Sequence, residues 1–448
     1  IRWLENLGDW NVSRQLWWGH RIPVWYGPDG EIVATKESPG EGYEQDTDVL
    51  DTWFSSGLWP FATLGWPEET GDLEYFYPTK LLSTAREIMY LWVARMIMTG
   101  LRYRDEAPFE KINVHSIVLA ADGTKMSKSK GNAVNPLELF EEYGTDAVRF
   151  GLLYQSSTQD FAYSHERAAM GRAFVTKLWN ATRFILGYPE PDGDGEQMSV
   201  ADRWILSEFN NVARDYDALL EECEFSEAMR LVYNFAWGQF ADWYVEISKA
   251  TPSPATPRVI REVFSGILRL SHPAMPFVTE EMSRLIGAEK LLVWQEFPQF
   301  DAALEDEEAG DLLERTKRAV SAVRRFRAES KVDGELEVLL PDGVEPRILT
   351  ALAGLSPVEE LNGANATLPA GDVVVEIALT EEQRRGEIER LRKEIERVGK
   401  EVERARNKLS NAKFVERAPE EVVAGEREKL EVNAAMLDTL TRRLEEYL

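Results

Sequence analysis

A short polar loop between Asp122 and Asn132 holds the residues of this chain that are best suited to chemistry. It carries Lys125, Lys128 and Lys130 together with two serines and two glycines. Lysine ammonium groups and backbone N–H groups on a Gly-flanked loop can hold a polyphosphate as negative charge develops on it. The alternative is a solvated basic turn, which most short Lys/Ser runs form.

Three features favour polyphosphate binding over a solvated turn. Met126, a residue type common in cores, interrupts the polar run, and an apolar β-type run from Ile112 to Leu119 precedes it. The loop also concentrates lysine in a chain whose net charge is −27. Helices are predicted after it, from Pro136 to Tyr143 with proline at the first position and from Asp146 to Tyr154. Strand, loop and helix in this order are typical of α/β folds, which bind ligands at the carboxyl ends of parallel strands.

Composition limits the classes of protein to which the chain can belong. Its 448 residues, of which 44% are hydrophobic, predict about three packed domains and exclude general disorder. The single cysteine, Cys223, excludes a disulfide framework and a cysteine-based zinc site, and it fits a reducing cytoplasm. No apolar run approaches the ~20 residues of a membrane span, so we expect no membrane partner. A start at Ile1, without a signal peptide, is typical of the middle of a longer protein.

The charge distribution bears on nucleic acid as a partner. A net charge of −27 and a pI near 4.7 argue against nucleic acid for the chain as a whole. Screening confines exposed fields to about 10 Å, however, so a local basic face is compatible with this total. The question is therefore where the 51 Lys and Arg residues cluster.

The first 110 residues combine aromatic, acidic and apolar side chains. The block from Trp10 to Trp25 is dense in tryptophan and arginine, and such density is rarely only core, because each indole N–H needs a partner. The stretch from Asp48 to Gly57 places acids beside Trp53 and Phe54. Residues Thr84 to Thr99 are apolar nearly all round and predict a buried helix.

The middle of the chain is helical in pattern, and breakers at 189–193, 251–254 and 272–273 divide it. The predicted helices run from His165 to Leu186, Ala201 to Glu222, Phe225 to Ala250 and Thr256 to Leu270. They predict a helical bundle. Beyond residue 300, a helix over 311–329 and two β-type runs, Glu335 to Leu340 and Val373 to Leu379, indicate a small α/β module.

The tail carries two heptad series joined by an irregular turn at 410–419. Apolar residues recur at spacings of three and four from Ile388 to Leu409 and again from Leu430 to Tyr447. Because each series is short, an antiparallel helical hairpin is favoured over an intermolecular coiled coil. The first helix is rich in basic residues, among them Arg392 and Arg404. Interspersed Glu residues explain many of these as salt-bridge partners, but the arm is the best local candidate for contacting phosphates.

Several of these blocks resemble one family. The sequence from Lys125 to Ser129, followed by Gly131 and Asn132, resembles the KMSKS signature loop of class I aminoacyl-tRNA synthetases. Further blocks resemble valyl-tRNA synthetases, namely Asn11 to Trp25, Asp48 to Pro60, Trp92 to Met98, and, in the region of their anticodon-binding domain, Lys177 to Ala181, Phe240 to Tyr244 and His272 to Phe277. A C-terminal helical hairpin is itself a feature of valyl enzymes.

The motifs that the chain lacks indicate which part of a full-length family member it resembles. The family's other ATP signature, His-x-Gly-His, does not occur in it, and the chain does not contain the inserted editing domain, which would lie before residue 1. The chain therefore resembles the carboxyl-terminal half of a valyl-tRNA synthetase. Where the family carries Thr-Gly-x-Asp near the ribose of ATP, this chain has Ala85 and Glu87 in place of the Gly and Asp. Loop 26–45 lacks the cysteines of a zinc knuckle, so no zinc is expected.

The resemblance implies adenylate formation, in which the carboxylate of valine attacks the α-phosphate of ATP and pyrophosphate leaves. Positioning and charge neutralisation then supply most of the rate. Lys125 and Lys128 would neutralise the pyrophosphate as the catalytic residues, and Met126, Ser127 and Ser129 would shape the loop around ATP. Mg²⁺ would arrive with the nucleotide.

Other roles follow from the resemblance together with residue type. His115 and Glu87 are expected beside the adenosine of ATP, with a satisfied strand histidine as the alternative for His115. Asp48 is expected to bind the α-ammonium of valine, with a capping or turn role as the alternative. Trp18 and Trp53 are expected to wall the pocket for the valine side chain, with ordinary core positions as the alternative.

Contacts with tRNA are expected in two places. The candidates are Arg172, Lys177 and Arg183 in the bundle and Arg392 and Arg404 in the arm, and the alternative for each is a solvated, salt-bridged face. Aromatic side chains near the bundle residues could stack on unpaired bases, which is the usual way in which single-stranded RNA is read.

Together these observations predict a mainly α fold with an α/β part. The predicted domains are the second half of a class I Rossmann-type catalytic domain with the KMSKS loop (1–160), a helical-bundle anticodon-binding domain (161–300), a small α/β linker module (301–380) and an antiparallel coiled-coil hairpin that binds tRNA (381–448). The predicted function is valine–tRNA ligation by a cytoplasmic monomer acting on valine, ATP and tRNA(Val), with this segment inactive alone. The alternatives are a non-catalytic tRNA-binding module and a fragment of an isoleucyl-tRNA synthetase.

Overall fold

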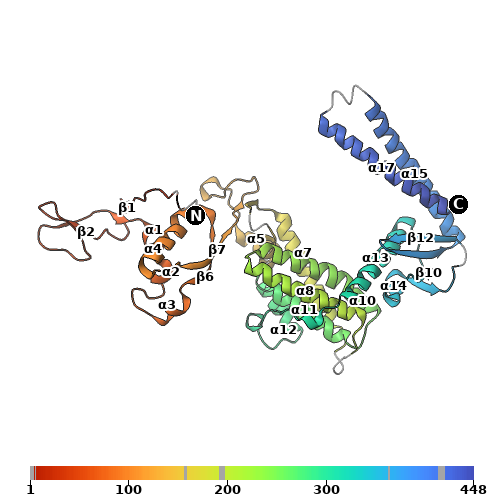
Figure 1. The fold of residues 1–448 in the computed structure, drawn as a ribbon, viewed down its shortest axis with the longest axis horizontal. Helices are drawn as coiled ribbons and strands as arrows, with labels where there is room; N and C mark the ends of the chain where they lie inside the picture. Colours follow the sequence, from red (N-terminus) through yellow and green to blue (C-terminus); the bar gives the residue numbers. More distant parts are fainter. Residues whose placement is uncertain are drawn as a thin grey trace. The chain divides into compact units, whose positions relative to one another are not determined.

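The computed structural model describes residues 5, 7–155, 159–190, 197–361, 364–411 and 419–447. Contacts between residues divide the chain into two compact units. The first comprises Ile1–Glu142, Gly151–Ala168 and Glu222–Glu227, and the second comprises Tyr143–Phe150, Ala169–Glu221 and Ala228–Leu448. Short strands and short helices make up much of the first unit, whereas long helices dominate the second (Figure 1).

Small sheets form the framework of the first unit. Its strands are β1 (Ser13–Arg14), β2 (Val24–Tyr26), β3 (Ile32–Ala34), β4 (Glu44–Gln45), β5 (Val49–Leu50), β6 (Thr79–Ala85), β7 (Phe109–His115), β8 (Val118–Leu119) and β9 (Phe161–Ala162). β1 pairs with β5, and β2 lies between β3 and β4, all antiparallel. The pairs β6–β7 and β8–β9 are parallel. These two parallel pairs lead into the lysine loop.

Helices of the first unit are short, and some of them contribute to two small apolar clusters. They are α1 (Thr52–Ser56), α2 (Trp59–Ala62), α3 (Gly71–Phe76), the 3-10 helices η2 (Arg86–Ile88) and η4 (Lys128–Lys130), the π-helix η3 (Met89–Val93) and α4 (Ala94–Arg104). One cluster buries Leu82, Val93, Met96 and Phe109, and the other buries Phe61, Leu73 and Tyr77. α5 (Pro136–Tyr143) and α6 (Thr145–Leu153), most of which belongs to the second unit, follow the loop, close to the predicted bounds.

Two expectations for this region were wrong. Thr84 and Ala85 end strand β6 instead of opening a helix, because parallel pairing with β7 recruits them into the sheet. The α-helix begins only at Ala94, and it is not buried all round, since Met98 and Leu101 are half exposed. The predicted strand from Ile112 to Leu119 is also divided, because β7 pairs with β6 while β8 pairs with β9.

The second unit contains most of the predicted helical bundle. Its bundle helices are α7 (His165–Leu186), α8 (Val200–Glu221), α9 (Phe225–Asn234), the π-helix η5 (Phe235–Tyr244), α10 (Val245–Ala250), α11 (Thr256–Ser271), α12 (Pro276–Leu285) and the 3-10 helices η6 (Leu292–Trp294) and η7 (Ala302–Leu304). The first residues of α7 and of α9 belong to the first unit. α9, η5 and α10 run on from one another, which confirms the predicted helix from Phe225 to Ala250. Trp204, Tyr216, Phe240 and Phe264 are among its largest fully buried side chains.

A buried carboxylate joins three elements of this bundle. Asp202, near the start of α8, is completely buried. It accepts hydrogen bonds from the hydroxyls of Tyr244 (2.6 Å), Ser253 (2.6 Å), Thr256 (3.0 Å) and Ser199 (2.6 Å). A buried charge is tolerated only when donors replace its hydration, and these four hydroxyls do so. The contact therefore ties the start of α8 to η5 and to the start of α11.

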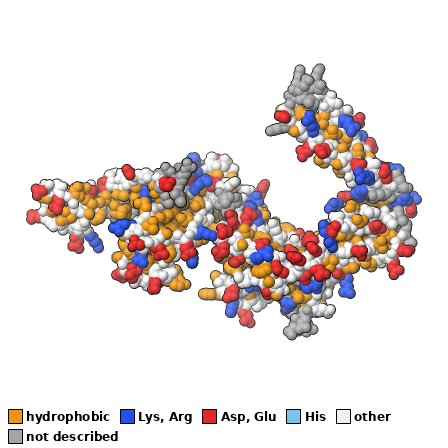
Figure 2. All heavy atoms as spheres, in the orientation of Figure 1, with side chains coloured by type: hydrophobic (Ala, Val, Ile, Leu, Met, Phe, Trp, Pro, Cys, Tyr) orange, Lys and Arg blue, Asp and Glu red, His pale blue; other side chains and the backbone are white. Residues whose placement is uncertain are grey.

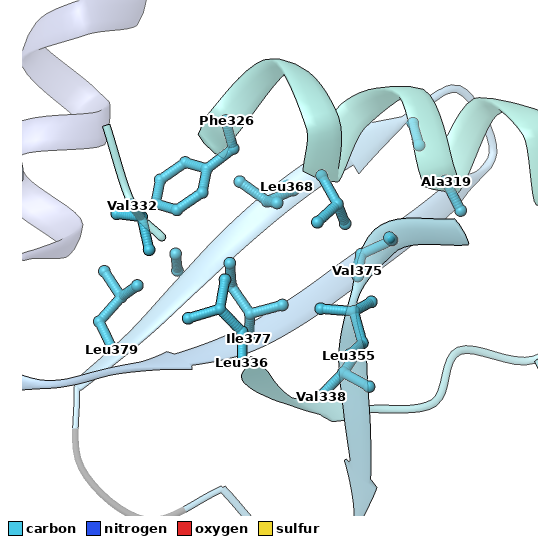
Figure 3. Packing of buried hydrophobic residues seen from close by; sticks show 14 of the residues in the cluster. Ala319, Phe326, Val332, Leu336, Val338, Leu355, Leu368, Val375, Ile377 and Leu379 are labelled. Carbon is cyan, nitrogen blue, oxygen red and sulfur yellow. The ribbon is translucent and has the colours of Figure 1, made fainter. Parts of the chain in front are cut away.

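The small α/β module is confirmed, with a larger sheet than predicted. Its elements are α13 (Glu307–Ser330), β10 (Leu336–Leu339), α14 (Pro346–Ala353), β11 (Leu355–Val358), β12 (Ala364–Ala370) and β13 (Val373–Leu379), and its strand order is β11-β10-β13-β12. Phe326 and Ala319 of α13 lie over one face of this sheet, toward Leu368 and Val375 (Figure 3). β11 and β12 escaped prediction because proline and alanine weaken their strand pattern.

The predicted C-terminal hairpin is also confirmed. It consists of α15 (Glu381–Ser410) and α17 (Glu420–Glu446), and the turn predicted between them lies largely outside the described residues. Contacts from Arg384 to Tyr447 and from Lys408 to Glu426 show that the helices are antiparallel. Acidic and basic side chains are mixed along the hairpin face drawn in Figure 2. Among the described helices, none is long and apolar enough to cross a lipid bilayer.

Candidate functional site

The lysine loop starts where parallel strands end. In the β6–β7 pair, Ala85 lies opposite His115, so both strands finish at the same sheet edge. Glu87 follows β6 directly, and the loop follows β8. The carboxyl edge of a parallel pair is where α/β folds place ligands.

Local hydrogen bonds close the first half of the loop into a tight turn. Leu119 and Lys125 form an antiparallel bridge, and the N–H of Gly123 donates to Ala120 O (2.8 Å). Gly123 has φ +78°, a left-handed conformation that suits glycine. Asp122 Oδ1 accepts from the N–H (2.9 Å) and hydroxyl (2.7 Å) of Thr124, and these bonds lower the pKa of Asp122.

Asn132 holds the second half of the loop against the first. Its Oδ1 accepts from the N–H of Ser127 (2.9 Å), and its Nδ2 donates to Thr124 Oγ1 (3.0 Å) and to Lys125 O (3.2 Å). The hydroxyls of Ser127 and Ser129 lie 2.7 Å apart. One amide side chain therefore organises the backbone on both sides of the signature residues.

The loop presents cations beside an acidic strand end. Lys125 Nζ lies 2.5 Å from Glu87 Oε2, and both side chains are substantially exposed. Arg86, the neighbour of Glu87, pairs with Asp160, whose Oδ1 also accepts from the N–H of Ile117 (3.0 Å). These contacts connect the end of β6 to the loop. The side chain of Lys128 lies outside the described residues.

This arrangement suits anion binding. Exposed Lys125 and Lys130 on a hydrogen-bonded loop give a polyphosphate both charge and directed N–H groups at little reorganisation cost. Met126 and Ser127 are half-buried and anchor the loop, while Ser129 is exposed. His115 is exposed at the end of β7, with Nδ1 2.9 Å from Ser116 O. Its role beside adenosine stays a prediction.

Near the block from Trp10 to Trp25, the buried acidic side chain is Asp51 and not Asp48. Asp48 is half-buried and accepts from the side chain of Gln15 (2.6 Å). Asp51 is buried, caps α1, and accepts from Trp10 Nε1 (2.9 Å) and from Arg14 (2.6 Å). Its place directly before the helical Thr52–Ser56 stretch was an N-cap signal that our sequence analysis did not use.

A buried arginine was also missed. Arg95 on α4 is 4% exposed, and its guanidinium lies 4.3 Å from the ring centre of Trp10. Trp10 in turn donates its indole N–H to Asp51, and Asp51 caps α1. These contacts hold the start of α1, which carries the half-buried Trp53. Trp18, in contrast, is 88% exposed. The pocket roles of Trp53 and Trp18 remain predictions.

The three basic residues predicted on α7 lie on two different faces. With about 100° per residue, Arg172 and Arg183 fall within about 20° of each other, whereas Lys177 lies about 140° away. Lys177 binds Asp242 (2.6 Å) and lies 5.1 Å from the ring centre of Trp237. Arg172 and Arg183 are exposed.

On the hairpin, Arg392 and Arg404 are both exposed residues of α15. Arg404 pairs with Glu401 one turn earlier (3.5 Å), as a solvated helix face would. Their contacts with tRNA stay a prediction. Among the described residues, no group of three or more His, Cys, Asp or Glu side chains could hold a metal ion.

Three family models match successive parts of the chain. "tRNA synthetases class I (I, L, M and V)" matches residues 1–164, "Anticodon-binding domain of tRNA ligase" matches 202–340, and "Valyl tRNA synthetase tRNA binding arm" matches 385–447. These matches confirm the predicted fold class, with a class I catalytic part, an anticodon-binding helical part and a C-terminal helical hairpin.

Curated relatives agree with these models. The valine–tRNA ligase of Clostridium tetani is 40% identical over 99% of this chain and 55% of its own length. That of Streptomyces coelicolor is 41% identical over 99% of this chain and 53% of its own length. The chain therefore spans about half the length of the curated relatives that it matches.

One solved structure shares the fold. The LeuRS in the ternary complex with tRNA and LeuAMS from Agrobacterium radiobacter is 18% identical and superimposes with a TM-score of 0.58. The match covers 67% of this chain and 43% of that chain.

Proposed function

Because the chain is a homologue of the carboxyl-terminal half of valine–tRNA ligases, which are class I aminoacyl-tRNA synthetases, we propose that it supplies that half of a valine-activating enzyme. The whole enzyme joins valine to ATP, releases pyrophosphate, and transfers the valyl group to tRNA(Val). We further propose that it works in the cytoplasm as a monomer, with ATP as its Mg²⁺ complex and without zinc.

The observation that carries this proposal is the hydrogen-bonded lysine loop, whose Lys125 reaches Glu87 at the carboxyl end of β6. In the reaction, Lys125 and Lys128 neutralise charge that grows on the leaving pyrophosphate. Met126 and the hydrogen bonds of Ser127 and Asn132 keep the loop in shape. Donors that are already oriented stabilise this charge better than water does.

The remaining roles are assigned to residues around the loop. Glu87 and His115 bind the adenosine part of ATP, and Asp48 binds the ammonium of valine. Trp18 and Trp53 line the side-chain pocket. Contacts with tRNA(Val) are made by Arg172, Lys177 and Arg183 of α7 and by Arg392 and Arg404 of α15. The proposed domain boundaries are the ones predicted from the sequence.

The test is reconstitution. The chain is mixed with the amino-terminal half of a valine–tRNA ligase that carries the His-x-Gly-His signature, and valine-dependent ATP–pyrophosphate exchange is measured. Lys128→Ala and Lys125→Ala should each lower the exchange rate by about 10²–10³, the usual cost of losing one stabilising donor. Lys80→Ala is the control, because Lys80 is exposed on β6 and pairs with Glu110 (3.0 Å). An unchanged rate for Lys128→Ala would refute the loop assignment.

A second candidate is a tRNA-binding module without catalytic activity. It is favoured by the match of the hairpin to a tRNA-binding arm and by the fact that the chain spans about half of its relatives. Salt-sensitive tRNA binding without exchange in the reconstituted mixture would support it. Isoleucine-dependent exchange would support an isoleucyl enzyme, although the relatives named above are valine–tRNA ligases.

A further inference from the structure

The helix that carries Trp53 is held at its start by a buried carboxylate. Asp51 is 7% exposed, and its Oδ1 accepts from the N–H of Trp53 (3.4 Å) as the N-cap of α1. Its other oxygen, Oδ2, accepts from Trp10 Nε1 (2.9 Å) and from Arg14 Nη2 (2.6 Å). One side chain therefore joins the start of α1 to residues that lie 41 and 37 positions away in the chain.

The end of α1 is held by η3 and α4. Trp92 Nε1 donates to Ser56 O (3.1 Å), and the hydroxyl of Thr99 donates to Gly57 O (2.5 Å). A Cβ added to Gly57 would lie 3.2 Å from the Cβ of Arg95, so α4 and the end of α1 approach closely at this glycine. A helix of five residues has little stability of its own. These contacts with distant residues therefore decide where α1 lies.

Arg95 connects the two ends of α1. It is 4% exposed, and its guanidinium lies 4.3 Å from the ring centre of Trp10 and 5.6 Å from that of Tyr90. Arg95 thus touches the end of α1 at Gly57 and, through Trp10, the carboxylate at its start. Its Nε is buried and finds no hydrogen-bond partner among the residues that the structure describes. Because such burial costs free energy, packing alone would be served better by an apolar side chain of similar size.

We propose that Arg95, Trp10 and Asp51 are positioning residues for the pocket that binds the amino-acid side chain. By holding α1 at both ends, they fix the place from which Trp53 projects and so set the size of that pocket. The inference rests on the proposed function, in which Trp53 lines the pocket. An apolar wall excludes a side chain that is longer by one methylene group only if the wall cannot move. A firmly held α1 therefore favours valine over isoleucine, and a loosened α1 accepts both.

The first measurement is amide hydrogen exchange of α1 in the whole chain. Arg95→Met keeps the length of the side chain but removes the guanidinium, and Trp10→Phe keeps an aromatic ring but removes the indole donor. Each should make exchange of α1 about tenfold faster, the effect of losing one contact on local opening. Arg102→Met is the matched control, because Arg102 is exposed on the same helix and lies 5.7 Å from the ring centre of Tyr103. Unchanged exchange in both variants would overturn the inference.

The second measurement compares valine with isoleucine in ATP–pyrophosphate exchange by the reconstituted mixture. Arg95→Met and Trp10→Phe should each raise the KM for valine more than they lower kcat, and should raise the isoleucine-to-valine ratio of kcat/KM about tenfold. Arg95→Lys keeps a cation for the ring of Trp10 and should recover part of the preference for valine. Loss of folded protein would lower both activities alike. An unchanged ratio would therefore show a merely structural role and overturn the inference.

The outcomes separate this inference from the proposed function. If the unaltered mixture shows no exchange with valine, the proposed function is contradicted and the inference falls with it. If exchange occurs but Trp53→Ala leaves the KM for valine unchanged, Trp53 does not line the pocket, so the inference is overturned while the valine activity stands. If Trp53→Ala raises the KM but Arg95→Met and Trp10→Phe keep the ratio of the control, the inference alone is wrong.

Discussion

The ammonium of Lys125 lies 2.5 Å from the carboxylate of Glu87 and joins the signature loop to the end of β6. The two residues are 38 positions apart in the chain, and parallel pairing of β6 with β7 brings them together. If Lys125 binds polyphosphate as proposed, polyphosphate and Glu87 compete for the same cation, and nucleotide binding then requires this exposed ion pair to open.

Replacing Glu87 should release that cation. Glu87→Gln removes the competing charge, and an exposed pair is worth about 0–1 kcal/mol, so the chain should bind magnesium pyrophosphate about two- to fivefold more tightly. Isothermal titration calorimetry measures this. Glu69→Gln is the control, because Glu69 pairs with Arg104 (2.7 Å) away from the loop. Weaker binding by Glu87→Gln would show that Glu87 supports the anion site instead of competing with it.

Asn132 should affect the rate of ATP–pyrophosphate exchange although it is not a charged residue. Asn132→Ala removes the acceptor for Ser127 N–H and two donors, which hold both halves of the loop together. At about 0.5–1.5 kcal/mol per hydrogen bond, we expect exchange in the reconstituted mixture to fall about tenfold or more.

Matched variants make that measurement specific. Asn132→Asp keeps the acceptor for Ser127 N–H but replaces the donor to Lys125 O with a charged oxygen, so it should lose at least as much activity as Asn132→Ala. Asn135→Ala removes a hydrogen bond from Leu137 N–H (3.1 Å) at the start of α5, outside the signature residues, and should leave the rate nearly unchanged. Equal losses at positions 132 and 135 would contradict the role of Asn132.

A buried ionic cluster should fix the root of the hairpin. Glu387 is 1% exposed and accepts from Arg390 (2.6 Å), Arg443 (3.3 Å) and, on α13, Ser330 (2.6 Å). Glu387→Gln leaves the arginines without their buried partner, a loss of about 3 kcal/mol. Amide hydrogen exchange at the ends of α15 and α17 nearest the module should become about 100-fold faster. Glu396→Gln, which breaks only the exposed pair with Lys400 (2.7 Å), should change little.

The same cluster should respond to acid. Burial raises the pKa of Glu387, but hydrogen bonds from Arg390 and Ser330 and the charges of both arginines lower it overall. A lowered folded-state pKa means that the stabilisation is complete above the unfolded value of about 4.3 and is lost as the pH falls through the folded-state value. The difference in thermal midpoint between the unaltered chain and Glu387→Gln should stay constant from pH 8 to about 5 and shrink below about pH 4. A constant difference down to pH 3 would contradict this.

Long periodic segments were predictable without tertiary information. The α7 bounds, His165–Leu186, agree with the prediction at both ends, and the heptads of α15 and α17 indicated the hairpin. A stripe of apolar residues over many turns predicts a helix from local spacing alone, because each turn places an apolar side chain on the same buried face. Strands β11 and β12 lacked such a pattern, and Thr84–Ala85 joined a sheet because of pairing with distant residues.

The sequence by itself determined the lysine loop, the succession of helices and the likeness to class I synthetases, because each depends on residues close together in the chain. Only the tertiary structure decided that Glu87 faces Lys125, that Asp51 instead of Asp48 is buried, and that Phe277 of α12 and Trp179 of α7 line one hollow. These relationships join residues brought together by strand pairing and helix packing. Burial and charge decide which of these distant residues come together, and the local spacing of residues does not encode that choice.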